Sequence, residues 1–336
     1  MPTLAIDIGG TFLRCAVVSD SGEISSVRRT RILNFLDGLG PDVIWDSILT
    51  AIVDFAMECR ELLGARDQAV VSFPGPIVNG RTILAAPTVV GKDVAIPDVV
   101  TMLENRLGRR VRLLNDLSAA AWFLSDQVPA DRFMVVTISS GIGSKIFDRR
   151  HPFGVLDDVP YAGEIGHCIV DRSLEAPHCD CGERGHLGAI SSGRGTIRLA
   201  RRYASADAEG FAASLCSWQF GGTADTLTNE AHFVPAVRAG DAWATRVLHV
   251  AMQPLATAIA VIAFAAGLEH VALIGGFAIE IGPAYVACLR DFFDLQTGGV
   301  PIALPREGFL SLAVMHPDAC LLGAAAFARR TPSIGR

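Results

Sequence analysis

A short segment near the middle of the chain gathers four side chains of the kinds that bind zinc, and these are His167, Cys179, Cys181 and His186. Thiolates and imidazoles in a closed set of four favour a tetrahedral, structural zinc ion. A carboxylate, Glu164, lies three residues before the first of them. The spacing therefore predicts a loop over residues 164–188 that zinc holds together, with Glu164 placed beside it to bind a ligand.

Two other interpretations of the cysteines remain open at this point. Cys179 and Cys181 could form a redox pair, although their spacing lacks the two-residue spacer typical of such pairs. They could also be unrelated packed thiols, although the charged residues between and after them make the segment too polar for a core. His178 could replace His186 as a ligand. The remaining cysteines are expected to be packed thiols: Cys15, Cys59, Cys168, Cys216, Cys288 and Cys320.

Two glycine-rich turns have the composition of phosphate-binding turns. One apolar strand runs into Asp7-Ile8-Gly9-Gly10-Thr11, and another runs into Ser139-Ser140-Gly141-Ile142-Gly143. Glycines let backbone N–H groups approach phosphate oxygens, the Thr11 hydroxyl can donate a hydrogen bond, and Asp7 can hold Mg²⁺ through water. Either turn alone could be a plain hairpin turn. Because the same pattern occurs twice, we predict that both turns bind phosphate.

A third motif, Asn115-Asp116, stands where an apolar strand gives way to a helical pattern. These residue types serve well as helix caps, so a purely structural role is one interpretation. The other is a general base that takes a proton from an alcohol as the alcohol attacks phosphorus. One residue could do both. Gly275-Gly276 follows a further strand and could let a purine or ribose lie against the backbone, or could be an ordinary loop.

The pattern of apolar residues predicts the elements that carry these groups. Strands are expected over 4–6, 14–19, 69–73, 111–114, 134–138, 145–147 and 271–274, and helices over 42–63, 100–107, 117–124, 195–203, 208–216, 242–266 and 318–329. Pro74-Gly75-Pro76 forms a rigid break after one of the strands. The two strand–turn–strand units predict a duplicated α/β fold with two lobes that face a cleft.

Length and composition disfavour several classes of protein. The chain has 336 residues, 50% of them hydrophobic, and a net charge of −6, which is typical of a globular protein with one large or two ordinary domains. Basic residues form only isolated pairs, so we expect no nucleic-acid partner. The apolar run 255–268 is too short to span a bilayer, and we expect neither a signal peptide nor a membrane partner. Eight cysteines in such a chain favour a reducing cytoplasm.

These motifs, in this order, resemble the ROK family of bacterial sugar kinases, within the actin, hexokinase and Hsp70-like superfamily. The resemblance extends from Leu4 to Arg329. It rests on Asp7-Ile8-Gly9-Gly10-Thr11, Phe73-Pro74-Gly75-Pro76, Asn115-Asp116 followed by Ala119-Ala120-Ala121, Ser140-Gly141-Ile142-Gly143, the Glu164–His186 segment, Gly275-Gly276 and Leu322-Gly323-Ala324-Ala325. It implies a two-lobed actin-like ATPase of duplicated RNase H-like domains, with ATP and acceptor in the cleft. The smaller lobe would span residues 1–115 and be completed by a helix at about 317–330, and the larger lobe would span 116–316.

The resemblance also implies roles for individual residues. Asp116 would be the catalytic base, and the acceptor would contact Gly75, Asn115, Asp116, Glu164 and His167. ATP would lie against Gly9, Gly10, Thr11, Ser140, Gly141, Gly143, Gly275 and Gly276. His167 would use one ring nitrogen for zinc and the other for a sugar hydroxyl, which suits the fixed tautomer of a metal-bound imidazole. The cofactors would be ATP, Mg²⁺ near Asp7 and a structural zinc, in a cytoplasmic homodimer.

The chain departs from the family pattern mainly on the acceptor side. The zinc set of the family usually has one histidine and three cysteines, whereas the last position here is His186. Two residues later the family normally carries a glutamate that grips the anomeric end of the sugar, and this chain has Gly188. Loss of that carboxylate removes hydrogen-bond selection, which is steep. Thr88, Lys92, Phe12 and Lys145 also differ from the residues usual at their positions.

We therefore expect an ATP- and Mg²⁺-dependent kinase that phosphorylates an exocyclic primary hydroxyl of a hexose-like polyol, with an atypical acceptor such as a C7-cyclitol or a modified sugar. The alternative is an ordinary glucokinase or an N-acyl-hexosamine kinase. A sugar-sensing transcription regulator is disfavoured, because family regulators carry a DNA-binding segment ahead of the first turn and only six residues precede Asp7. A non-catalytic sugar-binding protein is disfavoured by the presence of Asp116.

Overall fold

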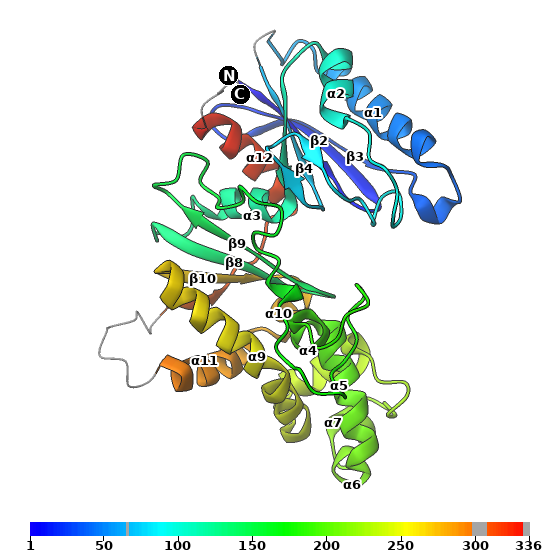
Figure 1. Cartoon of the computed structure of the whole chain (residues 1–336), viewed down its shortest axis with the longest axis vertical. Coiled ribbons are helices and arrows are strands. Elements are labelled where there is room, and N and C mark those ends of the chain that lie inside the picture. The colour runs from blue at the N-terminus through cyan, green and yellow to red at the C-terminus, as the bar shows by residue number, and fades with distance from the viewer. Residues whose placement is uncertain (65–66, 298–307, 332–336) are drawn as a thin grey trace. The chain divides into compact units, whose positions relative to one another are not determined.

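The computed structural model of the chain describes residues 1–64, 67–297 and 308–331 (Figure 1). Its contacts divide it into two compact units. The first unit comprises residues 1–131, 145–162 and 315–336, and the second comprises residues 132–144 and 163–314.

The first unit is built on a five-stranded sheet of order β3-β2-β1-β4-β7. The strands are β1 (Thr3–Ile8), β2 (Phe12–Val18), β3 (Ile24–Arg31), β4 (Ala69–Phe73) and β7 (Val111–Asn115). Helices α1 (Pro41–Glu58) and α2 (Val99–Leu107) cover one face, and α3 (Asp116–Leu124) and α12 (Ala319–Arg330) lie on the other (Figure 1). The small elements are η1 (Phe35–Asp37), β5 (Ile77–Val78) and β6 (Thr82–Ile83).

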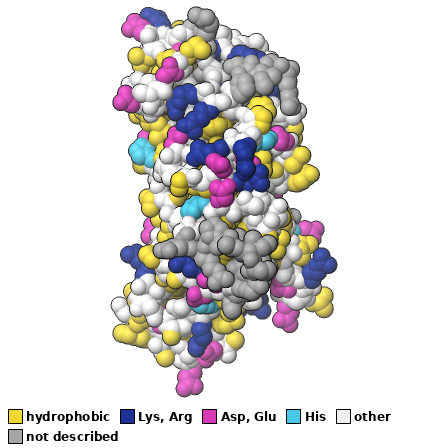
Figure 2. All heavy atoms as spheres, turned by 90° about the vertical axis from the view of Figure 1, so that its left-hand side faces the viewer, with side chains coloured by type: hydrophobic (Ala, Val, Ile, Leu, Met, Phe, Trp, Pro, Cys, Tyr) yellow, Lys and Arg dark blue, Asp and Glu magenta, His cyan; other side chains and the backbone are white. Residues whose placement is uncertain are grey.

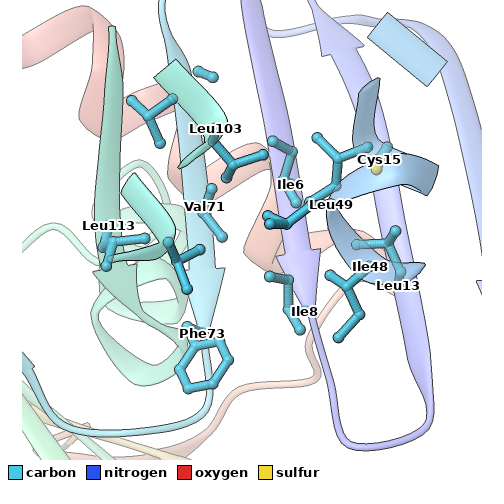
Figure 3. Packing of buried hydrophobic residues seen from close by; sticks show 14 of the residues in the cluster. Ile6, Ile8, Leu13, Cys15, Ile48, Leu49, Val71, Phe73, Leu103 and Leu113 are labelled. Carbon is cyan, nitrogen blue, oxygen red and sulfur yellow. The ribbon is translucent and has the colours of Figure 1, made fainter. Parts of the chain in front are cut away.

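The hydrophobic core of this unit lies between its sheet and α1 and α2. Ile6 and Ile8 of β1 point toward Ile48 and Leu49 of α1, and Phe73 lies at the end of β4 (Figure 3). All five of these side chains are fully buried. Every residue of β1 and β4 is buried, which is typical of central strands with helices on both faces.

The second unit is built on a four-stranded sheet of order β11-β10-β8-β9. The strands are β8 (Arg132–Ile138), β9 (Ile142–Asp148), β10 (His270–Ile274) and β11 (Leu310–Leu312), and the later residues of β9 belong to the first unit. The helices and helical turns are η2 (Ile165–His167), α4 (Leu187–Ser191), α5 (Gly193–Ala206), α6 (Ala208–Ala212), α7 (Leu215–Trp218), η3 (Asn229–Phe233), α8 (Val234–Arg238), α9 (Ala242–Ala266), α10 (Gly276–Ile281) and α11 (Pro283–Thr297).

The two sheets repeat one arrangement. In the first, the hairpin β1–β2 is followed outward by β4 and β7, which run parallel to β1. In the second, consecutive strands β8 and β9 are neighbours, and β10 and β11 continue the sheet in parallel with β8. The predicted duplicated α/β fold is therefore confirmed.

The boundary between the units differs from the predicted lobe boundary. Helix α3 was assigned to the larger lobe from the sequence, but it belongs to the first unit because it packs against α12. Gly323 permits this packing, since a Cβ atom there would lie 1.8 Å from the carbonyl oxygen of Ala119. The C-terminal helix α12 also belongs to the first unit.

Several predicted elements have different bounds. The helix predicted over 208–216 consists of two short helices, α6 and α7, because the Ser214 hydroxyl donates to the Phe211 carbonyl at 2.6 Å and competes with helix continuation. Helix α1 ends at Glu58 rather than at residue 63. Strand β3 escaped prediction because its half-buried positions are mostly polar, as on an edge strand, so the sequence shows no apolar alternation.

Helix α9 is long and apolar enough, by length and composition alone, to cross a membrane. Half of its most apolar window is buried inside the protein, where it packs against α4, α5 and α11. Core helices of soluble proteins have the same property, so the helix gives only weak evidence for a membrane span.

On the face drawn in Figure 2, basic side chains occur in small groups next to acidic ones.

Candidate active site

Strand register brings the predicted catalytic residues of the first unit to one edge of its sheet. Asp7 of β1 pairs with Ser72 of β4, and Phe73 of β4 pairs with Asn115 of β7. The strands β1, β4 and β7 are parallel, so their carboxyl ends meet at the same edge. Ligands bind at this edge in open α/β sheets.

Asp7 is a buried carboxylate with two fixed partners. Its Oδ1 accepts a hydrogen bond from the Ser72 hydroxyl at 2.9 Å, and its Oδ2 lies 2.6 Å from the Arg14 guanidinium. Arg14 is the antiparallel partner of Asp7 in the β1–β2 hairpin, so the register of the two strands creates the ion pair. These contacts fix the orientation of the carboxylate, and each oxygen keeps a lone pair that could accept a hydrogen bond from a water of hydrated Mg²⁺.

The turn after Asp7 is tightly packed on one side and exposed on the other. The Gly9 N–H donates to the Phe12 carbonyl at 2.9 Å, and the Gly10 carbonyl accepts from the Asn34 amide at 2.8 Å. A Cβ atom on Gly10 would lie 3.1 Å from the Thr88 carbonyl oxygen. Thr11 is exposed. The turn therefore has the composition and exposure of a phosphate-binding turn, and its glycines allow the close packing behind it.

Asn115 connects two further predicted residues. Its amide nitrogen donates to the Gly75 carbonyl at 3.0 Å, and its side-chain oxygen accepts from the Leu117 N–H at 3.0 Å, so it caps α3. A Cβ atom on Gly75 would lie 2.5 Å from the Ala85 carbonyl oxygen, which explains the glycine. The structure thus brings Gly75, Asn115 and Asp116 together. Asn115 acts as the cap, which leaves Asp116 as the first residue of the helix.

Asp116 has the electrostatics of a base that works near neutral pH. Burial raises the pKa of the Asp116 carboxyl to about 6, and the negative charge of Asp7 adds to this rise. The Leu117 N–H, which donates to Asp116 Oδ1 at 2.8 Å, and the positive charge of Lys145 both oppose it. A carboxylate with such a pKa is largely ionised at neutral pH and still accepts a proton readily.

The second unit repeats the strand-end arrangement with its own glycines. Ile274 of β10 pairs with Thr137 of β8, so the turn after β8 and Gly275-Gly276 lie at the same sheet edge. Gly275 has a φ of +96°, and a Cβ atom there would lie 2.5 Å from the Ile138 carbonyl oxygen. Position 275 therefore requires glycine, because the backbone has a positive φ and because a side chain would clash with the Ile138 carbonyl.

The turn after β8 is anchored by its own backbone and by α5. The Ser139 N–H donates to the Gly141 carbonyl at 3.0 Å, and the Gly193 N–H donates to the Ser139 carbonyl at 2.8 Å. Arg194 Nε donates to the Ser140 carbonyl at 2.7 Å. A Cβ atom on Gly141 would meet nothing within 4 Å, so its backbone faces open space in the second unit. Gly143 follows in β9.

The four predicted zinc ligands gather in the second unit, with all ligand atoms within 4.8 Å of one another. The Nδ1 atoms of His167 and His186 are 3.4 Å apart, the Cys181 Sγ lies 3.3 Å from His186 Nδ1, and the Cys179 Sγ lies 4.0 Å from His167 Nδ1. A tetrahedral zinc with ordinary bond lengths places two nitrogens about 3.3 Å apart and a nitrogen and a sulfur about 3.6 Å apart. The four side chains therefore fit a zinc ion.

The loop that carries this cluster is closed by backbone hydrogen bonds. The Cys179 N–H donates to the Glu183 carbonyl at 2.8 Å, and the Leu187 N–H donates to the Cys168 carbonyl at 2.9 Å. His178 is exposed and lies outside the cluster, so the geometry favours His186 as the ligand. The use of Nδ1 on His167 leaves its Nε2 for a second partner.

Two glycines with different constraints lie beside this cluster. A Cβ atom on Gly166, in η2, would lie 2.2 Å from the Ile142 carbonyl oxygen, so no other residue fits. A Cβ atom on Gly188, in α4, would lie 3.2 Å from the Gly166 carbonyl oxygen, with no other atom nearer than 3.8 Å. This contact is tight, so a side chain at position 188 requires the Gly166 carbonyl to move by a few tenths of an ångström.

Two polar residues near the predicted site were not assigned a role from the sequence. Arg14 and Arg194 hold Asp7 and Ser140, respectively. The contact of Arg14 with Asp7 could have been predicted from the register of the β1–β2 hairpin. The contact of Arg194 with Ser140 could not, because it depends on the tertiary fold. One prediction about the cysteines was wrong: Cys168 is exposed rather than packed, because it directly follows the exposed His167 in the loop.

Comparison with known proteins defines the class. Residues 3–331 match the ROK family, and the chain belongs to it. It is 38% identical to a C(7)-cyclitol 7-kinase of Streptomyces hygroscopicus subsp. jinggangensis over 94% of this chain and 91% of that protein. It is 31% identical to an N-acetylmannosamine kinase of Citrobacter koseri over 98% of this chain and 99% of that protein.

Solved structures agree with this assignment. The ROK family glucokinase from Streptomyces griseus, in complex with glucose and AMPPNP, is 25% identical, covers 98% of this chain and 99% of its own, and has a TM-score of 0.67. The ROK hexokinase from Thermus thermophilus, at 24% identity with a TM-score of 0.71 and 97% coverage of both chains, shares the fold. The predicted family, the actin-like fold and an enzyme that transfers phosphate to an alcohol are confirmed by these relatives.

Proposed function

We propose that the protein is an ATP- and Mg²⁺-dependent kinase that transfers the γ-phosphate to an exocyclic primary hydroxyl of a C7-cyclitol. The observation that carries this proposal is the placement of Asp116 at the start of α3, beside Asn115 and Gly75, with its pKa raised to about 6 by burial. A positioned carboxylate of this kind is what an alcohol needs to become a nucleophile toward phosphorus.

The proposed reaction assigns a separate task to each group of residues. The acceptor hydroxyl gives its proton to the Asp116 carboxylate as its oxygen attacks the γ-phosphorus, and ADP leaves. Gly75, Asn115, Glu164 and His167 contact the acceptor. Backbone N–H groups of the two glycine turns, with Gly275-Gly276, contact ATP. Phosphoryl transfer depends mainly on positioning and on stabilisation of charge, which fits a site with few reactive side chains.

The metal ions of the proposal have separate roles. Mg²⁺ would neutralise charge on the phosphates, and Asp7, whose oxygens are held by Ser72 and Arg14, would retain it through water. Zinc would fix the loop that carries Glu164 and His167, through His167, Cys179, Cys181 and His186. The match between the ligand spacing and a tetrahedral ion supports the zinc.

The proposed acceptor follows from two independent observations. The relatives at 37–38% identity are named C(7)-cyclitol 7-kinases, whereas the N-acetylmannosamine kinases are 29–31% identical. By the resemblance to the family, Gly188 takes the place of a sugar-binding glutamate, and a side chain there would need only the Gly166 carbonyl to move by a few tenths of an ångström. An acceptor without an anomeric hydroxyl needs no carboxylate at that position, and a carbocyclic cyclitol is such an acceptor.

Glucose and an N-acyl-hexosamine are the second candidates, because family members act on both. We also infer a cytoplasmic homodimer that binds no nucleic acid and no membrane. Light scattering on the purified protein tests the dimer. A particle of twice the mass of the chain supports the inference, and a monomer contradicts it.

An ADP-release screen tests the proposed function. Purified protein is assayed with MgATP and with hydroxymethyl-bearing C7-cyclitols, hexoses and N-acyl-hexosamines, and Gly188→Glu is assayed in parallel. We expect the highest kcat/KM with a cyclitol. A high kcat/KM for glucose without turnover of cyclitols would favour the second candidate. The same rate of ADP release with and without every acceptor would contradict a kinase of this type.

A further inference from the structure

A buried lysine lies in the same unit as the proposed base. Lys145 in β9 is one of only two lysines in the chain, and it is 8% exposed. Burying an ammonium group is costly unless it is paired and hydrogen-bonded. Lysine is also the basic side chain that is more strongly hydrated and loses its charge more readily on burial than arginine. A buried lysine at this place therefore requires an explanation.

The ammonium group of Lys145 is connected to the helix that Asp116 begins. Asp157 Oδ2 lies 4.0 Å from Lys145 Nζ, and the same oxygen accepts a hydrogen bond from the Ser118 hydroxyl at 2.6 Å. Ser118 is fully buried and stands two residues after Asp116 in α3. The three side chains thus form a polar chain that ends in the first turn of α3.

The same ammonium group also holds the segment that leads to Glu164. Lys145 Nζ donates to the Ala162 carbonyl at 2.9 Å. The preceding residue, Ser144, donates to the Gly163 carbonyl from its N–H at 2.9 Å and from its hydroxyl at 3.2 Å. Two consecutive residues of β9 therefore hold two consecutive carbonyls directly before Glu164.

We propose that Lys145 is a positioning residue for phosphoryl transfer, which fixes the start of α3 through Asp157 and Ser118 and the segment before Glu164 through the Ala162 carbonyl. This inference rests on the proposed function, which gives Asp116 and Glu164 their tasks. Stability does not account for the lysine, because replacing a buried ion pair with apolar side chains is often neutral or stabilising. Its positive charge also lowers the pKa of Asp116 and so favours the ionised form that a base requires.

Three variants test this role: Lys145→Met, which keeps the length and removes the charge, Lys145→Arg, which keeps the charge, and Asp157→Asn. Each is assayed with MgATP and a hydroxymethyl-bearing C7-cyclitol or, where wild type prefers it, glucose. We expect Lys145→Met to lower kcat about 100-fold, the typical loss for misplacement of reacting groups by about 1 Å. The KM for ATP and the melting temperature should be unchanged, Lys145→Arg should recover part of kcat, and Asp157→Asn should lie between.

Two results would overturn the proposal. One is a Lys145→Met enzyme with kcat and acceptor KM equal to those of wild type. The other is equal loss in Lys145→Met and Lys145→Arg that follows only the folded fraction. Should Lys145→Met fail to fold, Asp157→Asn and Lys145→Arg decide, and wild-type kinetics in Asp157→Asn would overturn the proposal. Asp116→Asn separates the two hypotheses, because full activity there contradicts the proposed base, whereas an inactive Asp116→Asn beside a fully active Lys145→Met contradicts only the role of Lys145.

Discussion

The sheet edge of the first unit and the loop over residues 164–188 of the second unit hold their predicted functional groups in different ways. At the sheet edge, Asp7 and Asn115-Asp116 are placed by strand register and by backbone hydrogen bonds. In the loop over residues 164–188, short turns with backbone hydrogen bonds bring four side chains together, and their ligand atoms lie within 4.8 Å of one another. The groups at the edge are therefore positioned by a sheet, whereas those in the loop are positioned by a few turns and by the cluster.

This difference predicts that the two regions respond differently to substitution. A change at the sheet edge should remove chemistry and leave the fold intact, because the strands and their core remain. A change in the loop should weaken acceptor binding and loosen the loop, because only a few backbone hydrogen bonds and the cluster of four side chains hold it.

Asp116→Asn should have the largest effect. Loss of the base should lower kcat about 10²- to 10⁴-fold, the usual contribution of general base catalysis. The affinity for MgATP should be unchanged, because Asp116 does not contact it in the proposed reaction. Steady-state kinetics with calorimetric ATP binding measure both. Retention of wild-type kcat would show that Asp116 is only a helix residue.

Cys181→Ser should affect the loop rather than the chemistry. We expect loss of bound zinc and an acceptor KM raised about 10- to 100-fold, the range seen when metal-site contacts are removed. The KM for ATP should stay within about twofold of wild type, since the sheet edges are not altered. Elemental analysis and kinetics check this. Cys168→Ser is the matched control, because Cys168 is exposed and lies outside the cluster, and an equal effect there would contradict the assignment.

The pH dependence of kcat/KM should report the ionisation of Asp116 at the sheet edge. Because the pKa of Asp116 is about 6, kcat/KM should fall tenfold for each pH unit below that value and level off above it. The pKa of Asp116 in the folded protein lies above that of an aspartate in the unfolded chain, so folding favours the protonated carboxyl. The contribution of this protonation to the free energy of unfolding is therefore present at low pH and is lost as the pH rises through about 6. Asp116→Asn should consequently be no less stable than wild type at pH 7. A profile without a step near pH 6 would contradict this assignment.

Gly188→Glu should have the smallest effect on catalysis, and it should change which acceptor the enzyme prefers. The Cβ atom needs only a small shift of the Gly166 carbonyl, so the variant should fold, and kcat/KM should move from the cyclitol toward glucose by about 10-fold or more, as hydrogen-bond selection allows. Gly166→Ala is the contrasting variant, because its Cβ would lie 2.2 Å from a backbone oxygen, and it should be strongly destabilised. An unchanged preference in Gly188→Glu would remove Gly188 from the account of specificity.

The sequence predicted what depends on local pattern. The strand 69–73 and the helix 242–266 have the predicted bounds, and residue types and spacing alone picked out the four side chains that the fold gathers in the loop over residues 164–188. The edge strand β3 was missed because only one of its half-buried positions, Ile24, is apolar, so no apolar alternation marks it. The contacts of Lys145 with Asp157 and Ala162 were not predictable, since they form only when the chain folds back after β9.

The position of the phosphate on the product tests the central claim most directly. The proposed kinase transfers phosphate to an exocyclic CH₂–OH group, so proton-coupled ³¹P NMR of the product made from a C7-cyclitol and MgATP should show a triplet from the two methylene protons. Under the same conditions the signal should grow about 10²- to 10⁴-fold more slowly with Asp116→Asn. A doublet, which reports a phosphate on a ring CH–O carbon, or inorganic phosphate as the sole product would contradict the account.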